Sequence, residues 1–499
     1  MEHVLLIYWM GPLRLHNNFK MGRLGRYFIL LMLVAAGKHV SAQQMTDSVL
    51  TLQQCLDIGI KNNLVIKQTA AQMEANRVSW QQARENLLPS LNGDASQSFS
   101  QGRSLNPFTN GYLDQPITSG SYGLSSGLVL SSGLTLQNSI KQTSLAYQAG
   151  RMDFEQAKND LTLNLIIAYL QVLSGEDQLV LAKTQAAVSQ SQLDRAEVLN
   201  KEGAIPPQQL FDLKGQVATD QLSIINAQNS IAINKLSLLQ MLNVPYRKDV
   251  RLQRQPGDAI AQRYGDSADQ VYGVALNNFA SVKSGTLKRQ SAEKAVQVAK
   301  GALLPSLALY GGLNTTYSSA AQRSILVNQT VVPTSQFIET AGGGRQTVYT
   351  TQSNFIGQNI PYVDQFRNNY RTNISLGLSI PILNYFQNRN KVSLAKLNLQ
   401  TARDVEQTNQ LLLKVNIDKA YDNMAAAYER YQLVLSQTEA FTASFNIAEA
   451  RFNAGASTSV DFLIVKGNLD RAKTSLITAR YDYLIRTRIL DYYQGKLAL

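Results

Sequence analysis

The sequence predicts a mainly α-helical chain with a small β part, built from a helical hairpin that occurs twice. Three observations predict this fold class. Short motifs recur at fixed separations, segment 384–454 runs for 71 residues without Gly or Pro, and several short segments alternate apolar and small polar residues. Recurrence indicates duplication, unbroken length indicates long helices, and period-two alternation indicates strands.

Residues 1–42 have the features of a secretory signal peptide. Arg23 and Arg26 form a basic segment, residues 27–36 are ten consecutive apolar residues, and 40–42 are small residues typical of a cleavage site. Ten apolar residues are too few to span a bilayer as a helix. Met21 is a second candidate initiator, in which case 1–20 lie upstream of the true start. We therefore predict an exported mature chain.

The composition disfavours enzymatic chemistry. His3, His16 and His39 are the only histidines and all lie in the predicted leader, which leaves Cys55 as the only thiol of the mature chain. Such a chain cannot build a His-based triad, a zinc site of the usual ligands or a redox pair. We predict no catalytic residue, no cofactor and no metal site.

The charge distribution argues against nucleic-acid binding. Removing 1–42 takes away five basic residues and one acidic residue, which lowers the net charge from +12 to +8. The remaining charges are scattered, without the clustered basic face that binds phosphates. No mature segment has about eighteen consecutive apolar residues, so a membrane location would require a barrel.

Two repeats organise the mature chain. Segment 87–91, Leu-Leu-Pro-Ser-Leu, recurs at 303–307, 216 residues later. Three dipeptides recur 252 residues later: Ala168-Tyr169, Gly203-Ala204 and Lys214-Gly215. We predict a first repeat at 43–260 and a second at 261–499, the second with about 36 extra residues in a polar loop at 319–370.

The predicted helices are unusually long. A continuous helix over 384–454 would extend about 105 Å at 1.5 Å per residue. Its apolar residues recur in alternating steps of four and three from Leu413 to Phe452, interrupted only by Thr438, which favours a left-handed supercoil with neighbouring helices. Segment 136–202 is the matching long helix of the first repeat.

A shorter helix completes each hairpin, at about 206–242 and 460–493. Pro206-Pro207 presets the first helical turn of one, and Ser457, Thr458 or Ser459 can cap the other.

Four segments alternate like strands. Residues 374–382 place isoleucines and leucines on one face and Ser, Gly and Pro on the other, and 122–131 follow the same pattern. Segments 91–100 and 307–316 are weaker, and the first has a polar face of Asn, Asp and Ser. A soluble half-buried sheet would show similar alternation, but predicted export and ten-residue length favour a lipid-facing barrel.

The strand count requires oligomerisation. Four strands cannot close a transmembrane barrel, whose lower limit is about eight. Two copies would supply eight strands, which side chains fill, whereas three copies supply twelve and begin to leave an aqueous bore.

With these features, the chain resembles the TolC family of outer-membrane efflux proteins. Residues 51–63 look like the family's opening helix, the paired Leu-Leu-Pro-Ser-Leu segments look like its helix-to-strand junctions, and 451–455 match its Arg-aromatic-x-x-Gly hairpin tip. The order of the duplicated parts carries the likeness more than any single motif. Pro89, Pro305 and Pro381 would mark the helix-to-barrel junctions.

The resemblance implies a homotrimer in the Gram-negative outer membrane. Its twelve-stranded transmembrane β-barrel, four strands per chain, would contact lipid, and its α-barrel would cross the periplasm. Its function would be a passive exit duct of an efflux or type I secretion system, docked to a periplasmic adaptor protein and an inner-membrane pump of RND, ABC or MFS type. The alternative is a periplasmic coiled-coil adaptor protein, which predicts one hairpin and a compact β-domain.

The resemblance also implies a gate. Family members carry lumen-facing acids six and nine positions after the second hairpin's Gly. In this chain Gly455 is followed at six by Asp461 but at nine by Ile464, and Gly203 is followed at six by Gln209 but at nine by Asp212. Rings of Asp461 and Asp212 would favour cations. Alternatively, Asp461 is an acid that stabilises a first helical turn.

The hairpin tips would contact the adaptor protein. Small residues there allow close approach of a partner's backbone, although glycine at a helix end is also ordinary turn chemistry. The tip residues are Gly203, Ala204, Ile205, Arg451, Gly455, Ala456 and Ser457.

Overall fold

The structure is a computed structural model that describes residues 49–105, 110–254 and 263–497. The predicted leader, with His3, His16 and His39, lies outside the described residues. The chain divides into two units, Met1–Val49 and Leu50–Leu499, and the second unit contains the helices and the four-stranded sheet.

Helices dominate this second unit, as the sequence predicts. They are α2 (Leu52–Asn62), α3 (Leu64–Glu85), α4 (Thr135–Lys201), α5 (Pro207–Leu242), α6 (Ala268–Asn278), α7 (Ala280–Gly301), α8 (Tyr362–Asn368), α9 (Gln387–Asn453) and α10 (Ser459–Gln494). The strands are β1 (Val49–Leu50), β2 (Ser90–Ser100), β3 (Arg103–Leu105), β4 (Tyr112–Asp114), β5 (Ile117–Ser132), β6 (Arg251–Leu252), β7 (Ser306–Ser318), β8 (Gln322–Glu339), β9 (Arg345–Asn359) and β10 (Arg371–Ser379).

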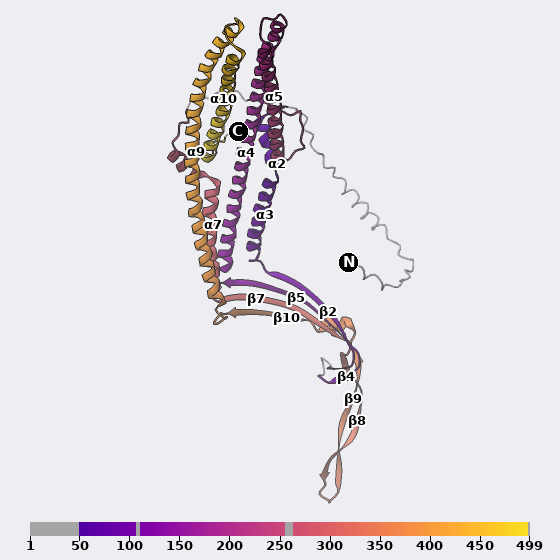
Figure 1. The fold of residues 1–499 in the computed structure, drawn as a ribbon. Coiled ribbons are helices and arrows are strands. Elements are labelled where there is room, and N and C mark those ends of the chain that lie inside the picture. The colour runs from indigo at the N-terminus through magenta and orange to yellow at the C-terminus, as the bar shows by residue number, and fades with distance from the viewer. Residues whose placement is uncertain (1–48, 106–109, 255–262, 498–499) are drawn as a thin grey trace, which may run out of the picture. The chain divides into compact units, whose positions relative to one another are not determined.

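The helical hairpin is duplicated, which confirms this part of the fold prediction. The starts of α2 and α6, of α3 and α7, and of β2 and β7 are each separated by 216 residues, and those of α4 and α9 and of α5 and α10 by 252. The long helices α4 and α9 both have 67 residues, and their partners α5 and α10 both have 36. Figure 1 shows α4 beside α5 and α9 beside α10.

The extra residues of the second repeat form strands, so the prediction of a polar loop at 319–370 is wrong. β8 and β9 pair as a two-stranded antiparallel ribbon, and α8 follows. Runs such as Ile325-Leu326-Val327 and Val331-Val332 have high strand propensity. Asn, Gln, Thr and Ser residues separate these runs, because a two-stranded ribbon tolerates polar side chains on both faces. Their frequency made the segment resemble a polar loop in the sequence.

The four predicted strands form one antiparallel sheet in the order β10-β7-β5-β2. Its register aligns the apolar faces of all four strands. Leu376 lies opposite Leu309, Leu309 opposite Leu128, and Leu124 opposite Leu313. Directly opposed residues share a face. The sheet therefore has one mainly apolar face and one face made mostly of Ser, Gly, Asn and Asp, which also includes Tyr310 and Val129.

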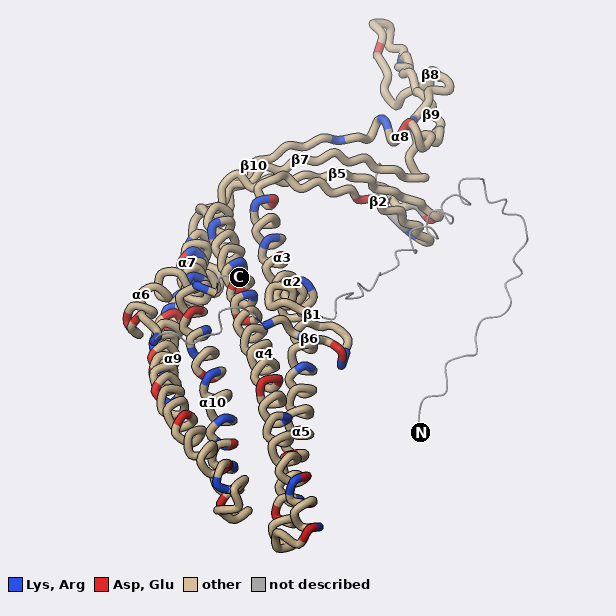
Figure 2. The backbone as a smooth tube through the Cα atoms, turned by 90° about the horizontal axis from the view of Figure 1, so that it is seen from above, with Lys and Arg blue, Asp and Glu red and all other residues tan. Residues whose placement is uncertain are grey.

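The apolar face is uncovered over much of its area. Ile374 is 83% exposed, Leu376 62% and Leu91 74%. Charged residues are sparse in the sheet and frequent along the helices (Figure 2). An apolar sheet face of this extent is a surface for burial, not for water.

Helix α8 packs on the end of the sheet that is remote from the long helices. Gln365 is 2% exposed, and its side chain bonds with both the backbone N–H and the carbonyl of Ser318. Tyr362 stacks with Phe366 and lies against Tyr122 and Tyr317 of the sheet. These contacts tie the end of the β8–β9 ribbon to β7.

The helical part has a conventional core. In the second repeat, Ile417 and Met424 of α9 are fully buried against Val271 of α6 and Leu490 of α10. Capping boxes at Thr51 and Ser267 begin the corresponding helices α2 and α6. Cys55 is fully buried on α2, as expected for a small apolar residue.

One described helix, α4, contains an 18-residue window with a mean hydropathy of 1.3, high enough for a membrane span by length and composition. Half of that window is buried inside the structure. Leu165, Val172 and Leu173 lie in this helix with no more than 1% of their surface exposed. Such burial is typical of a core helix that packs against other helices of its own chain.

Candidate functional site

The tips of the two hairpins have the same backbone geometry. Gly203 has φ +73° and Gly455 has φ +69°. The N–H of Ala204 donates to the Leu199 carbonyl, and the N–H of Ala456 donates to the Arg451 carbonyl, both at 2.8 Å. These bonds close a Schellman turn at the end of each long helix.

Both tip glycines are explained by this turn. A Cβ at Gly203 or Gly455 would meet no atom within 4 Å, so neither position requires glycine for close packing within the chain. The left-handed φ alone favours glycine.

The other tip residues differ in exposure. Ala204, Arg451 and Ala456 are exposed, Ser457 is half-buried, and Ile205 is half-buried against the cluster of Leu193, Ala196, Leu213 and Val217. The exposed backbone of the tips leaves them accessible to another protein.

Asp461 belongs to an N-terminal capping box of α10. The N–H of Asp461 donates to Thr458 Oγ1 at 3.1 Å, and the Thr458 hydroxyl donates to Asp461 Oδ2 at 2.7 Å. The Thr458 backbone N–H completes the box with a longer bond to the same carboxylate oxygen, 3.4 Å. Among the three capping residues that the sequence allows, the structure selects Thr458. The Asp461 side chain remains exposed.

Asp212 lies between the two hairpins. The Ser459 hydroxyl of α10 donates to Asp212 Oδ2 of α5 at 3.0 Å. Ser459 directly follows the cap residue Thr458, so the structure brings the two predicted gate acids, Asp461 and Asp212, to the same end of the hairpins. A second bridge joins Arg195 of α4 to Asn453 of α9 through two hydrogen bonds of 2.5 Å.

A buried charged cluster lies further along the same helices, and the sequence did not reveal it. Lys466 of α10 is 2% exposed, and its Nζ lies 3.1 Å from Asp220 Oδ2 of α5 and 2.6 Å from Asp470 Oδ2. Asp220 also accepts hydrogen bonds from Ser189 of α4 at 2.5 Å and from Gln216 at 2.8 Å. Three helices from both repeats thus contribute to one buried cluster, in which the ammonium contacts Asp220 and Asp470 and Ser189 contacts Asp220.

The acids of this cluster are in different settings. Burial raises the pKa of the Asp470 carboxyl, although the hydrogen bond from Lys466 opposes that rise. Asp220 is 5% exposed and has three hydrogen-bond donors around its two oxygens. The ammonium of Lys466 therefore offsets the burial of two carboxylates.

No repeat motif could have revealed this cluster. Lys214 is the counterpart of Lys466, 252 residues earlier, yet it is 47% exposed and pairs with Glu197 at 3.3 Å. At the positions that correspond to Asp220 and Ser189, the second repeat has Ala472 and Phe441. The two repeats therefore differ in the residues around this cluster. The surface of one hairpin that contacts the other is not the same in the two repeats.

The three predicted junction prolines lie between helices and strands. Pro89 lies between α3 and β2, Pro305 between α7 and β7, and Pro381 between β10 and α9. Proline has no backbone N–H and disfavours a helical conformation in the preceding residue, which suits these changes of direction.

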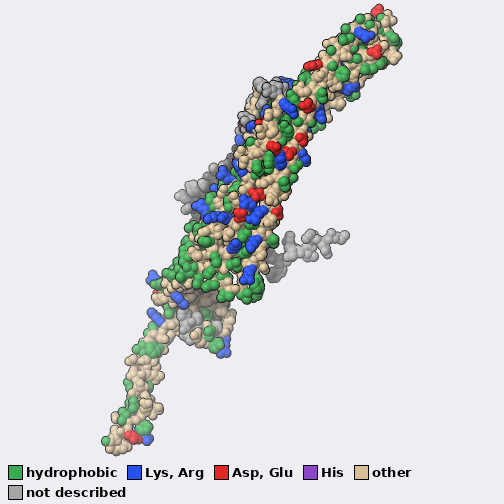
Figure 3. Space-filling model, turned by 90° about the vertical axis from the view of Figure 1, so that its left-hand side faces the viewer, with side chains coloured by type: hydrophobic (Ala, Val, Ile, Leu, Met, Phe, Trp, Pro, Cys, Tyr) green, Lys and Arg blue, Asp and Glu red, His purple; other side chains and the backbone are tan. Residues whose placement is uncertain are grey.

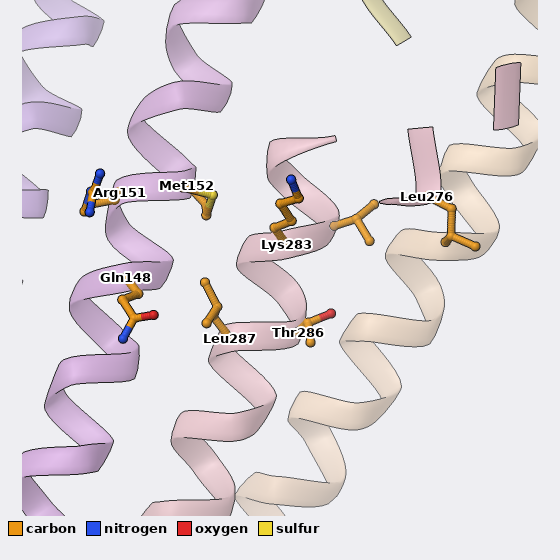
Figure 4. A pocket seen from close by; sticks show the side chains of 8 residues that line it. Gln148, Arg151, Met152, Leu276, Lys283, Thr286 and Leu287 are labelled. Carbon is orange, nitrogen blue, oxygen red and sulfur yellow. The ribbon is translucent and has the colours of Figure 1, made fainter. Parts of the chain in front are cut away.

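A shallow groove between α4 and α7 has a volume of about 430 Å³ (Figure 4). Met152 of α4 and Leu287 of α7 lie on its opposite walls, with Lys283 and Thr286 beside Leu287. None of its lining residues is His, Cys, Asp or Glu. Across the described residues, no group of three such side chains could hold a metal ion.

Comparison with known proteins agrees with this geometry. The outer membrane efflux protein family matches residues 56–244 and 271–495, which leaves out the join between the repeats. The outer membrane protein TolC of Escherichia coli is 22% identical over 476 residues, covering 91% of this chain and 84% of that protein. The pyoverdine export outer membrane protein OpmQ of Pseudomonas putida is 22% identical, covering 85% and 81%.

Solved structures share the fold. The CmeC outer membrane channel of Campylobacter jejuni superposes with a TM-score of 0.71 at 17% identity, covering 89% of this chain and 86% of that one. The outer membrane protein VceC of Vibrio cholerae has a TM-score of 0.70 at 13% identity, covering 89% and 96%.

Proposed function

The chain belongs to the outer membrane efflux protein family and is a subunit of an outer-membrane efflux channel, and from this premise we propose how it assembles and gates. In this proposal three copies join their sheets into a closed twelve-stranded barrel, and their long helices continue the tunnel into the periplasm. The observation that carries the proposal is the register of the sheet, which gathers the apolar residues of four strands on one face.

The unpaired edges of the sheet support assembly from several copies. β10 and β2 are the edge strands of the four-stranded sheet, so each has one side without a strand partner in that sheet. In a membrane, unpaired backbone groups are so costly that strands occur only in closed barrels. Pairing β10 of one copy with β2 of the next satisfies both edges, and three copies leave an aqueous bore.

The two faces of the sheet suit this arrangement. Ile374, Leu376 and Leu378 would contact lipid on the outside. Asn92, Asp94 and Ser96 of β2 lie on the other face with Ser125 and Gly127 of β5 and would line a polar lumen.

The same structure argues against the adaptor-protein alternative. That alternative predicts one hairpin and a compact β-domain, whereas the described chain has two matched hairpins and an open amphipathic sheet.

We place the periplasmic gate at the hairpin tips. Asp461 is exposed beside the tip, and Asp212 is held near it through Ser459. Threefold symmetry would repeat both carboxylates around one constriction and favour cations there. The exposed tips, around Gly203 and Gly455, would dock a periplasmic adaptor protein, which links the duct to an inner-membrane pump.

Assembly is tested by the mass and location of the intact protein. We expect it in the outer-membrane fraction and, in detergent, light scattering to give a protein mass three times that of one chain. A single-chain mass in a water-soluble fraction would contradict the proposal.

The gate is tested by separating the charge of Asp461 from its capping role. Gln at this position keeps the acceptor of a capping box but removes the charge, whereas Thr458→Ala removes the cap hydroxyl and keeps the charge. In planar bilayers we expect Asp461→Gln to raise conductance and weaken block by divalent cations. Thr458→Ala should leave divalent block unchanged. Equal block in Asp461→Gln and wild type would exclude the ring.

A further inference from the structure

The β8–β9 ribbon lies outside both the four-stranded sheet and the helical hairpins, and the proposed duct does not require it. It spans 322–359, between β7 and α8, and no strand of the first repeat has comparable length beyond the sheet. Helices α7 and α9 join β7 and β10 at the opposite end of the sheet. The ribbon therefore extends from the end that would face away from the periplasm.

Both faces of the ribbon carry exposed apolar residues. Ile325 lies opposite Ile356, and the next pair, Leu326 opposite Phe355, points to the other face. Ile356 is 60% exposed and Phe355 61%. Further out, Val331 and Tyr349 are 68% and 62% exposed. A lipid surface could cover one face of such a ribbon but not both.

The ribbon is almost uncharged. Its only charged residues are Arg323, Glu339 and Arg345, and Glu339 pairs with Arg345 at 3.6 Å. Figure 3 shows the ribbon as a mainly uncharged surface with scattered hydrophobic side chains and a charged pair at its tip. It thus lacks the charge that would select an acidic or basic partner, and identical copies of it would not repel one another.

The ribbon is also not expected to be stable without packing against another surface. Its sheet has only two strands in the part of the chain that the structure describes, so each strand has one open edge. Isolated two-stranded ribbons are marginally stable in water, and open edges favour pairing with other strands.

We propose that the three ribbons of an assembled channel pack on one another around the pore axis and form a collar at its outer mouth. This inference rests on the trimer of the proposed function. In a closed ring each ribbon has a neighbour on both sides, which covers two apolar faces at once. Attachment to a common barrel raises the local concentration of the ribbons and favours their contact.

Cysteine cross-linking tests the collar. Thr330 and Thr351 lie at the same height of the ribbon but on opposite faces, because Thr330 pairs with Gln352 and Val331 with Thr351. Both threonines are exposed, and the only native cysteine, Cys55, is buried. A front-to-back ring brings Thr330 of one copy to Thr351 of the next.

We expect the double variant Thr330→Cys/Thr351→Cys to form covalent dimers and trimers on mild oxidation in the outer membrane. Each single variant should stay monomeric in denaturing gels, because identical faces do not meet in such a ring. Adding Phe355→Gln and Ile356→Gln should reduce the cross-linked fraction several-fold.

Three other outcomes would contradict the proposal. A protein with trimeric mass whose double variant does not cross-link would contradict the collar and leave the barrel intact. Cross-linking in the single variants would contradict the front-to-back arrangement. A monomeric mass in detergent would remove both the collar and the assembly on which it rests.

Discussion

Lys466 of the second hairpin and Asp220 of the first form a buried ion pair, with Nζ 3.1 Å from the carboxylate oxygen and both residues at most 5% exposed. It is the most buried ionic contact between α5 and α10 in the described chain. A lone buried charge is strongly unfavourable. Separating the two hairpins at this level would therefore cost free energy, because it would remove the contact between the Lys466 ammonium and the Asp220 carboxylate. The pair therefore holds the hairpins in one relative register.

Removing the ammonium of Lys466 should destabilise the protein strongly. Lys466→Ala leaves Asp220 buried without its cation, and we expect a loss of about 3–5 kcal/mol. Lys214→Ala is the matched control, because its exposed pair with Glu197 is worth about 0–1 kcal/mol. Chemical denaturation followed by circular dichroism measures both. Equal losses in the two variants would show that burial of Lys466 does not decide its contribution.

Alanine at either tip glycine should destabilise its hairpin by a similar amount. The left-handed conformation costs a non-glycine residue about 1–2 kcal/mol, and Gly203 and Gly455 have nearly the same φ. Gly215→Ala is the control: this glycine lies inside α5 with open space around its Cβ position, so alanine should stabilise by about 0.5–1 kcal/mol. The midpoint of thermal unfolding measures all three variants. A shift of all three midpoints in the same direction would contradict the prediction.

An arginine should destabilise the protein on one face of the sheet and be tolerated on the other. Leu376→Arg puts a charge on the lipid-facing side of the proposed barrel and should destabilise it by about 2–4 kcal/mol. Ser375→Arg, on the adjacent position of β10, points to the polar face and should be tolerated. The yield of folded protein in the outer membrane distinguishes them. Equal tolerance of both would argue against a lipid-facing surface.

Cys55 should be chemically inert in the folded protein. Its side chain is fully buried, and burial raises the pKa of the thiol to about 12, so the reactive thiolate is scarce at neutral pH. Maleimide should label it only after denaturation, as mass spectrometry can measure. Rapid labelling of the native protein would show that α2 opens locally.

Acid should loosen the end of α10. Gln494 and Lys496 donate to Asp266, and these bonds hold the pKa of that carboxyl below its usual value. A pKa that is lower in the folded state stabilises above the ordinary value of about 4, and this stabilisation is lost as pH falls through the folded pKa.

Hydrogen exchange of the last turn of α10 checks this expectation. Protection should fall more between about pH 5 and about pH 3 in the wild type than in Asp266→Asn, whose side chain does not titrate. The same fall in both proteins would assign the effect to other groups.

Much of the architecture follows from local pattern. Segment 384–454 contains no helix breaker, and α9 occupies nearly all of it. The four alternating segments became the four strands of the sheet, because a period of two already places their side chains on alternate faces. The exception was 319–370, where polar residues between the apolar runs concealed β8 and β9.

The sites were less accessible to sequence reasoning. The sequence indicates that Asp461 lies in a first helical turn but does not indicate its capping box with Thr458, and the family resemblance implies a gate role for Asp212 but not its contact with Ser459. Sequence reasoning did not identify Lys466 as a buried ion-pair partner. The capping box is a local contact of residues three apart, whereas the contacts of Asp212 with Ser459 and of Lys466 with Asp220 depend on packing between helices far apart in the chain.

The sequence by itself determined the duplicated hairpins, the four strands of the sheet and the glycine turns, because spacing, propensity and φ preference act within a few residues. Only the tertiary structure decided which acids meet Ser459 and Lys466 and that the apolar faces of four strands coincide. The physical reason is that burial and charge pairing depend on which helix and strand faces come together, and one repeat's residues do not predict those of the other.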